Sequence, residues 1–140
     1  MNNSSHLNLA GTLFKLGYGV IPLRDDKRPV GAWKELQTTP KSPYEMVKSN
    51  SYGLICGVNG VEVLDLDYKA LPSEEDKDKH YNTMLSFIQE NIEDAYNKLA
   101  LYETMSGGVH IIYKTKQKEG NQVLAKLKDG RTLYETRGVG

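Results

Sequence analysis

Two acidic residues close an apolar run in the segment VEVLDLDYKA, residues 61–70. One residue separates Asp65 from Asp67, so in a strand their side chains point to the same face, while Leu64 and Leu66 point to the other. Two neighbouring carboxylates repel each other, which raises a pKa or attracts a cation. Oxygen ligands of this kind suit Mg²⁺ or Mn²⁺. On this pair alone, a strand that ends in solvent is the simpler explanation.

A glycine turn introduces a second candidate group in SGGVHIIYK, residues 106–114. Gly107 and Gly108 allow the backbone to approach a ligand closely, and Ser106 supplies a hydroxyl group. His110 lies near the start of the strand that follows and could donate a hydrogen bond to a phosphate oxygen. A partly buried histidine with a structural role is the alternative.

A third candidate group lies in LYETRGVG, residues 133–140. Glu135 and Arg137 share one face of a predicted strand, and glycines follow directly. The carboxylate could complete a metal site, and the forked donors of the guanidinium group could bind phosphate. A surface ion pair between the two residues is the alternative.

Composition indicates a globular protein of about one domain, because 39% of the 140 residues are hydrophobic and 26% are charged. The 18 basic residues balance the 18 acidic ones, so any binding of nucleic acid must depend on a local group of basic residues. Cys56 is the only cysteine, which excludes an internal disulfide and predicts a small apolar core residue. The sequence lacks an apolar run long enough to cross a membrane and a signal-peptide pattern, which predicts a cytoplasmic protein.

Hydrophobic periodicity and turn residues predict an α+β (α/β) fold, with a mixed, largely antiparallel sheet flanked by helices in a single domain, 1–140. The predicted helices are 7–16, 80–98, a short one within 121–130 and one or two turns at 44–50. The predicted strands are 20–23, 54–56, 61–66, two strands that flank the glycine turn within 100–115, and 131–138. The Asn-Gly pair predicts a hairpin between strands 54–56 and 61–66, and residues 24–43 and 69–80 are predicted loops.

Five motifs in this order resemble the archaeo-eukaryotic primase superfamily. The resemblance is strongest to the N-terminal domain of bifunctional DNA primase/polymerases of plasmids, phages and integrated elements. The motifs are GYGVIPLRDDKRPVGAWKELQTT, YGLICGVNG, VEVLDLD, SGGVH and YETRG, and together they cover about residues 10–140. Lys27, Arg28 and Trp33 match the family's loop without an assigned role, and we expect Trp33 to be a packing residue.

The resemblance implies a primase-polymerase catalytic core of the RRM-like type. It implies metal ligands for Mg²⁺ or Mn²⁺, namely Asp65, Asp67 and Glu135. It also implies nucleotide-binding residues, namely Ser106, Gly107, Gly108, His110 and Arg137. The catalytic set implied by the family is Asp65, Asp67, Glu135 and His110. On this interpretation the acids close a buried strand because a dication and a triphosphate compensate their charge.

The implied activity is template-directed nucleotidyl transfer by a two-metal mechanism in the replication of a plasmid, phage or mobile element. The implied partners are a single-stranded DNA template, nucleoside triphosphates and a downstream helicase domain or a separate helicase, with no membrane. Two alternatives stay open: a catalytically incomplete module that binds nucleotide or DNA, and a metal-dependent nuclease. The family's final motif continues into a further strand, whereas this sequence stops at RGVG, so we expect residues 1–140 to be the front part of a longer protein.

Overall fold

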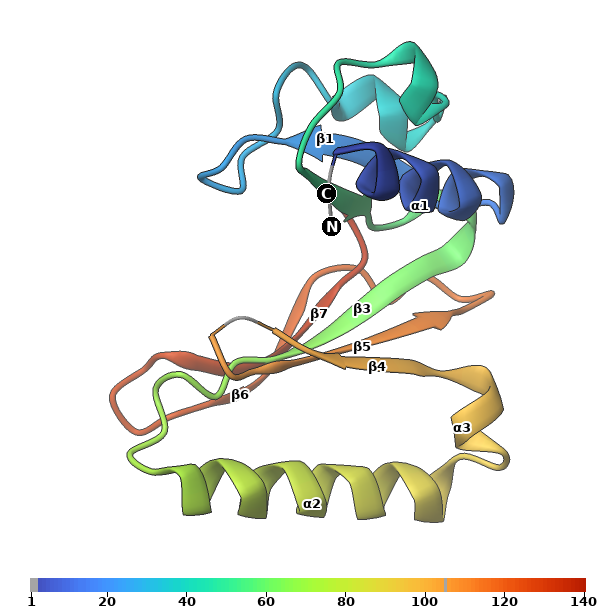
Figure 1. The fold of residues 1–140 in the computed structure, drawn as a ribbon. Coiled ribbons are helices and arrows are strands. Elements are labelled where there is room, and N and C mark those ends of the chain that lie inside the picture. Colours follow the sequence, from blue (N-terminus) through green and yellow to red (C-terminus); the bar gives the residue numbers. More distant parts are fainter. Residues whose placement is uncertain (1–2, 105) are drawn as a thin grey trace. The chain divides into compact units, whose positions relative to one another are not determined.

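The computed structural model describes residues 3–104 and 106–140, and it has the predicted α+β architecture with antiparallel strand pairs. The described residues divide into two compact units (Figure 1). The first unit contains the described residues up to Val61, with Lys114–Lys118 and Gly138–Gly140. The second unit contains Glu62–Tyr113 and Glu119–Arg137, so it holds every candidate site residue named above.

The first unit packs a helix and three short 3₁₀ turns around a two-stranded sheet. Its elements are α1 (Asn3–Lys15), β1 (Gly19–Leu23), η1 (Lys34–Gln37), η2 (Pro43–Glu45), β2 (Ser51–Ile55) and η3 (Val58–Gly60). The core consists of Ile21, Leu36, Ile55 and Val58. Trp33 packs against this core and Cys56 is buried, so both predicted packing roles are confirmed. The helix and strand predicted before residue 24 are confirmed as α1 and β1.

The predicted hairpin between strands 54–56 and 61–66 is wrong. β2 pairs antiparallel with β1, whereas the strand at 61–66 belongs to the sheet of the second unit. Asn59 does adopt a left-handed conformation, with φ of 53°, and its side-chain amide donates to the carbonyl oxygen of Gly17 at 2.6 Å. The Asn-Gly pair therefore bends the chain as its chemistry predicts. The Asn-Gly pair does not determine which strands β2 and β3 pair with, because contacts with residues distant in the sequence determine that.

The second unit is a five-stranded sheet in the order β4-β5-β3-β7-β6, with helix α2 along one face (Figure 1). The elements are β3 (Val61–Leu66), α2 (Glu74–Asn91), α3 (Ala95–Lys98), β4 (Ala100–Glu103), β5 (Val109–Lys114), β6 (Gln122–Lys126) and β7 (Thr132–Arg137). The pairs β4–β5, β3–β7 and β6–β7 are antiparallel. The strands predicted on both sides of the glycine turn and the final predicted strand are confirmed.

Helix α2 corrects two predictions. It begins after Ser73, whose hydroxyl oxygen accepts a hydrogen bond from the N–H of Asp76 at 3.1 Å, so the loop predicted at 69–80 is helical from Glu74 onward. Three acidic residues in its first turn suit the positive end of the helix dipole, and this N-terminal signal outweighs the mixed charge of the segment. The helix ends at Asn91 rather than at residue 98, and Asp94 takes a left-handed conformation before α3.

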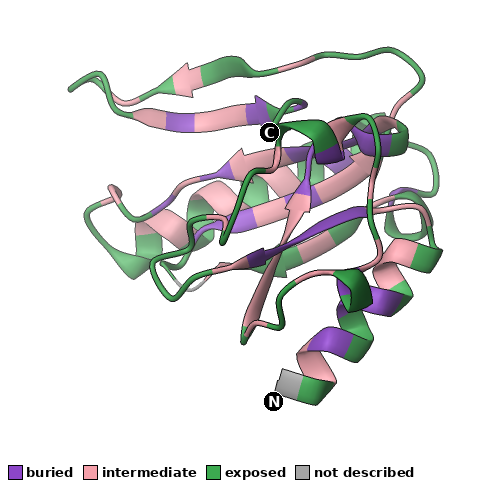
Figure 2. Ribbon diagram, turned by 90° about the horizontal axis from the view of Figure 1, so that it is seen from above, coloured by how far each residue is buried: buried purple, intermediate pink, exposed green. Residues whose placement is uncertain are grey.

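The apolar face of α2 packs on the sheet at helical spacing, through Tyr81, Met84 and Ile88. Leu66 on β3 and Val109 and Ile111 on β5 belong to the same core, whose buried positions Figure 2 marks along the strands. Because side chains alternate along a strand, the residues of β3 next to Leu66 point to the face that α2 leaves uncovered. The packing of α2 therefore decides which face of the sheet carries Asp65.

Residues 121–130 form a strand and a turn, so the short helix predicted there is wrong. β6 pairs with β7, and the chain reverses at Asp129–Gly130, where the N–H of Gly130 donates to the carbonyl oxygen of Leu127 at 3.0 Å. Gly130 has φ of 90°, which only glycine adopts readily. A short apolar run does not distinguish helix from strand, and here the ladder with β7 decides.

The second unit contains two buried polar groups, and the first is the hydroxyl of Tyr68, which lies in an aromatic cluster and has no hydrogen-bond partner among the described residues. The rings of Tyr68, His80 and Tyr134 lie 6.1–6.4 Å apart between centroids, and Nδ1 of His80 is 3.0 Å from the Tyr134 hydroxyl. Burial raises the pKa of the Tyr68 hydroxyl far above its ordinary value. This phenol therefore stays neutral across the physiological pH range.

The second buried polar group is the carboxylate of Glu62 on β3, which is only 1% exposed. It accepts hydrogen bonds from the backbone N–H groups of Glu119 at 3.3 Å and Gly120 at 3.1 Å. The Tyr113 hydroxyl lies 3.5 Å from the same carboxylate. The carboxylate thus anchors the loop that leads into β6, a role that the sequence reasoning did not find.

We predict that Glu62→Leu lowers the free energy of unfolding by about 1–3 kcal/mol, because it leaves part-buried backbone N–H groups without their acceptor. Glu62→Gln keeps one carbonyl oxygen, so we expect a smaller loss. The control is Glu103→Ala, an exposed glutamate on β4, for which we expect a change within about 0.5 kcal/mol. Urea denaturation measures all three. Equal stability of Glu62→Leu and wild type would contradict the anchoring role.

Candidate functional site

The register between β3 and β7 pairs Asp65 directly with Glu135. Residues paired in this way lie on the same face of a sheet, with Cβ atoms about 4.5–5.5 Å apart. Both side chains are partly covered, with 23% of Asp65 and 25% of Glu135 exposed. Two of the three predicted carboxylates are therefore cross-strand neighbours on the face that α2 leaves uncovered.

Asp67 lies one residue beyond the end of β3. Its N–H donates to the carbonyl oxygen of Leu133 at 2.8 Å, which continues the pairing with β7. Its carboxylate accepts from the N–H of Lys69 at 3.3 Å. Within residues 3–104 and 106–140, no three His, Cys, Asp or Glu side chains are gathered closely enough to hold one metal ion. Bringing the Asp67 carboxylate to Asp65 and Glu135 requires side-chain movement.

Each of the three carboxylates faces a basic side chain. Asp65 Oδ1 is 3.3 Å from His110 Nε2, and Asp67 Oδ2 is 3.6 Å from Lys69 Nζ. Glu135 Oε1 is 2.6 Å from Arg137 Nη2, which is the ion pair given above as the alternative for these two residues. Pairs this exposed contribute about 0–1 kcal/mol to stability. The main effect of the Lys69 and Arg137 pairs is to compensate negative charge at this end of the sheet, whereas His110 does so only when it is protonated.

His110 lies on β5 between two polar partners. Its Nε2 faces Asp65, and its Nδ1 is 2.9 Å from the hydroxyl oxygen of Tyr102. Tyr102 is the residue directly opposite His110 in the β4–β5 register, and the two rings meet edge to face with centroids 5.3 Å apart. The sequence reasoning missed Tyr102, although a tight hairpin centred on the glycine turn places it opposite His110.

The glycine turn uses its own backbone groups. The N–H of Gly107 donates to the Thr104 carbonyl oxygen at 3.0 Å, and the N–H of Gly108 donates to the Thr104 hydroxyl at 3.0 Å. A Cβ atom on Gly108 would lie 2.4 Å from the carbonyl oxygen of Leu66. Glycine is therefore needed at position 108 because the turn packs against the end of β3, whereas the prediction had attributed it to close approach of a ligand.

Two polar side chains lie at the tip of this turn. Ser106 is exposed, and its hydroxyl is 3.3 Å from that of Thr104. The ammonium group of Lys77 on α2 lies 3.5 Å from the point where a Cβ of Gly107 would stand. Only 21% of the Lys77 side chain is exposed, and its Nζ is 3.0 Å from Glu74. The sequence reasoning missed Lys77 because it placed this residue in a loop.

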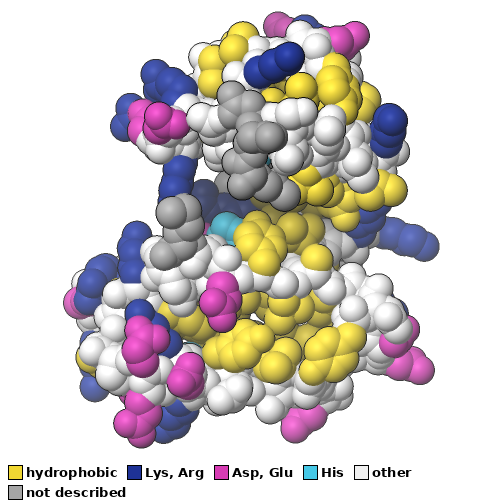
Figure 3. Space-filling view, viewed as in Figure 1, with side chains coloured by type: hydrophobic (Ala, Val, Ile, Leu, Met, Phe, Trp, Pro, Cys, Tyr) yellow, Lys and Arg dark blue, Asp and Glu magenta, His cyan; other side chains and the backbone are white. Residues whose placement is uncertain are grey.

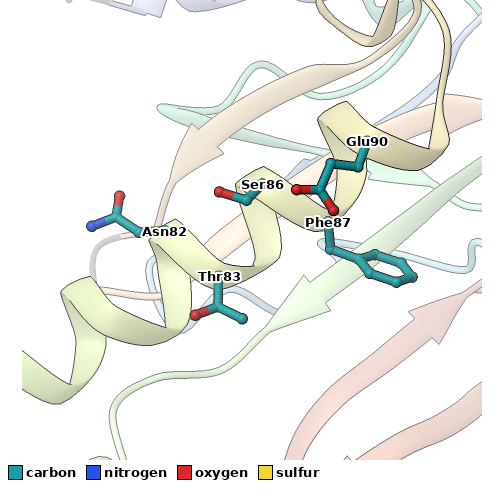
Figure 4. Close-up of a pocket in the computed structure, with 5 residues that line it drawn as sticks. All are labelled: Asn82, Thr83, Ser86, Phe87 and Glu90. Atoms are coloured by element: carbon teal, nitrogen blue, oxygen red, sulfur yellow. The ribbon is translucent and has the colours of Figure 1, made fainter.

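A separate pocket lies on the solvent side of α2, lined by Asn82, Thr83, Ser86, Phe87 and Glu90 (Figure 4). Its lining includes no basic side chain, so it is unsuited to phosphate. Figure 3 shows acidic and basic side chains intermixed on the visible face of the second unit, with apolar side chains exposed between them. The solvent side of α2, where the pocket lies, contains none of the predicted site residues.

A comparison with known protein families identifies the family of the chain. Residues 10–140 match the family described as bifunctional DNA primase/polymerase, N-terminal. The chain belongs to this family. A Prim-Pol domain of this kind takes a DNA template and nucleotides as substrates, and its family activity is that of a primase or polymerase. A search of curated proteins finds no match.

The helices of the Prim-Pol domain were also compared with the requirements of a membrane span. In the described part of the chain, none of them combines the length and the apolar character needed to cross a bilayer.

For the Prim-Pol glycine turn we predict that Gly108→Ala destabilises the domain by about 1–3 kcal/mol, because the added methyl group overlaps backbone at the end of β3. Gly31→Ala is the matched control: a Cβ there meets nothing within 4 Å, so we expect stability equal to or slightly above wild type. Thermal unfolding measures both variants. A melting temperature of Gly108→Ala equal to that of Gly31→Ala would contradict the packing role of the turn.

Proposed function

We propose that this Prim-Pol domain performs template-directed nucleotidyl transfer from nucleoside triphosphates on a single-stranded DNA template, in the replication of a plasmid, phage or other mobile element. The observation that supports the proposal most is the cross-strand pair of Asp65 and Glu135, with His110 against Asp65. The family match supports the class of reaction. Two carboxylates, which can bind a metal ion, and an imidazole, which can donate a hydrogen bond to phosphate, thus lie on one face of one sheet.

The donor set suits a hard divalent ion, because it consists of carboxylate oxygens. Asp65 and Glu135 would hold Mg²⁺ or Mn²⁺, and Asp67 would join them after leaving Lys69. When bound, such ions supply activation of the primer 3′-hydroxyl group and stabilisation of the pyrophosphate that leaves. Lys69 and Arg137 compensate the negative charge of Asp67 and Glu135 until a cation takes their place.

The chain's own residues bind and orient the triphosphate in this proposal. His110 donates from Nε2, the atom that faces Asp65, to a phosphate oxygen. The Ser106 hydroxyl is exposed at the tip of the turn and offers a further donor. The guanidinium group of Arg137 contacts Glu135 through Nε and Nη2, so the two N–H groups of Nη1 can meet phosphate. The glycine turn contributes position rather than backbone donors.

We predict that Asp65→Asn and Glu135→Gln abolish extension of a primed single-stranded DNA template with Mn²⁺ and labelled nucleotides, because each removes an ionised oxygen ligand. Asp78→Asn, at an exposed position of α2, is the control and should leave extension unchanged. Gel analysis of the products measures the outcome. Full extension by Glu135→Gln would contradict the metal role of the cross-strand pair.

We predict that His110→Ala weakens binding of nucleoside triphosphate about ten- to a hundredfold, the effect of losing one hydrogen bond to a charged group. Binding of Mn²⁺ to the nucleotide-free domain should survive. Isothermal titration measures each ligand separately. Loss of Mn²⁺ binding in His110→Ala as complete as in Asp65→Asn would make His110 a metal ligand and favour a metal-dependent nuclease.

A second candidate is a module that binds nucleotide or DNA without catalysis. The ion pairs of Asp65, Asp67 and Glu135 with their basic neighbours favour it, since these carboxylates are not gathered at one point. The extension assay separates the candidates. Nucleotide binding without incorporation indicates the binding module, and degradation of DNA with Mn²⁺ alone indicates a nuclease.

A further inference from the structure

We propose that Tyr102 is a positioning residue that fixes the ring orientation and tautomer of His110, so that Nε2 of the imidazole presents its N–H to the triphosphate. This inference rests on the proposed function, because it specifies how that site recognises phosphate. Tyr102 matches none of the motifs by which the sequence resembles its family. It enters the site only through the pairing of β4 with β5.

The hydrogen atoms of His110 follow from the chemistry of its two partners. An ionised carboxylate accepts hydrogen bonds and cannot donate them, so Nε2 carries the hydrogen that points to Asp65. In a neutral imidazole the other nitrogen then accepts. The Tyr102 hydroxyl, 2.9 Å from Nδ1, is the donor that meets this acceptor.

The same tautomer is the one that a phosphate group requires. Phosphate oxygens accept hydrogen bonds, so an imidazole with a lone pair on Nε2 would repel them, whereas Nε2–H attracts them. Tyr102 also resists rotation of the ring, because its own ring meets that of His110 edge to face at 5.3 Å. A ring turned over would present carbon rather than Nε2–H to the face that carries Asp65.

Tyr102→Phe tests the role because it removes only the hydroxyl group and keeps the aromatic ring. We expect affinity for ATP and dATP, measured with Mn²⁺ present, to fall about two- to tenfold, the usual effect of one neutral hydrogen bond. Affinity for Mn²⁺ alone should be unchanged. The control is Tyr113→Phe, on the same strand as His110, whose hydroxyl lies near Glu62; nucleotide affinity should stay at the wild-type value.

A double-mutant cycle shows whether Tyr102 acts through His110. In the His110→Ala background, Tyr102→Phe should produce no further loss of nucleotide affinity. An equal loss with and without His110 would overturn the positioning role and leave Tyr102 as a general structural residue. No loss in the wild-type background would overturn it as well.

Nitrogen NMR of the imidazole gives a readout that does not depend on nucleotide. Recorded at a pH at which the imidazole is neutral, the spectrum of wild-type His110 should show Nε2–H and a hydrogen-bonded Nδ1. Tyr102→Phe should shift the Nδ1 resonance toward the value of an acceptor without its donor, and Tyr113→Phe should not. A wild-type signal with the hydrogen on Nδ1, or an Nδ1 resonance unchanged by Tyr102→Phe, would overturn the inference.

The two proposals fail in different ways. Wild-type protein that binds neither ATP nor dATP contradicts the proposed function, whatever the imidazole resonances show. Wild-type protein that binds nucleotide, together with an unchanged Nδ1 resonance in Tyr102→Phe, contradicts the role of Tyr102 alone.

Discussion

The antiparallel register of β3 and β7 is the constraint on which the rest of the site depends. It sets Asp65 opposite Glu135, and a slip of one residue would move one of them to the face covered by α2. β3 lies between β5 and β7 in the sheet, so the strand with Asp65 separates the strand with His110 from the strand with Glu135. Strand order and register thus bring together residues that are far apart in the sequence.

Glu62 and Asp65 lie on opposite faces of β3, and their carboxylates differ in burial and in their partners. Glu62 is buried and accepts hydrogen bonds from backbone N–H groups, which no other ligand can displace without opening a loop. Asp65 is partly exposed, and its partner is the side chain of His110 rather than the backbone of a loop. The first carboxylate is therefore structural, and the second is available for exchange of partners.

Sequence reasoning reached the features that depend on local chemistry. The alternation of side chains on β3, the glycine turn before His110 and the strand that carries Glu135 all follow from residues within about ten positions of one another. Prediction from residue propensity failed where pairing with a distant strand determines the secondary structure. Residues 121–130 contain β6, which pairs with β7, instead of the predicted helix. This kind of prediction also failed for residues 74–80, where a capping serine and three acidic residues in the first turn begin a helix despite the mixed charge of the segment.

The partners of the site residues were harder to predict than the residues themselves. Tyr102 reaches His110 through hairpin register, and Lys77 reaches the glycine turn only because α2 packs below the sheet. Neither contact leaves a pattern in the sequence as specific as a short motif. The sequence therefore supplied the candidate binding residues, whereas their neighbours Tyr102 and Lys77 were found only from the fold.

The two compact units are interleaved along the chain, which passes from one to the other after Val61, Tyr113, Lys118 and Arg137. The first unit therefore includes residues from late in the sequence, which bond to earlier ones. The N–H of Cys56 donates to the carbonyl oxygen of Gly140 at 2.9 Å, and the N–H of Thr115 donates to the carbonyl oxygen of Gly60 at 2.9 Å. Neither unit is a contiguous segment, so neither can be cut out as a fragment or exchanged as a module between relatives. Proteolytic cleavage after Arg137 would remove the Gly140 carbonyl oxygen that accepts from the N–H of Cys56, a residue far earlier in the sequence.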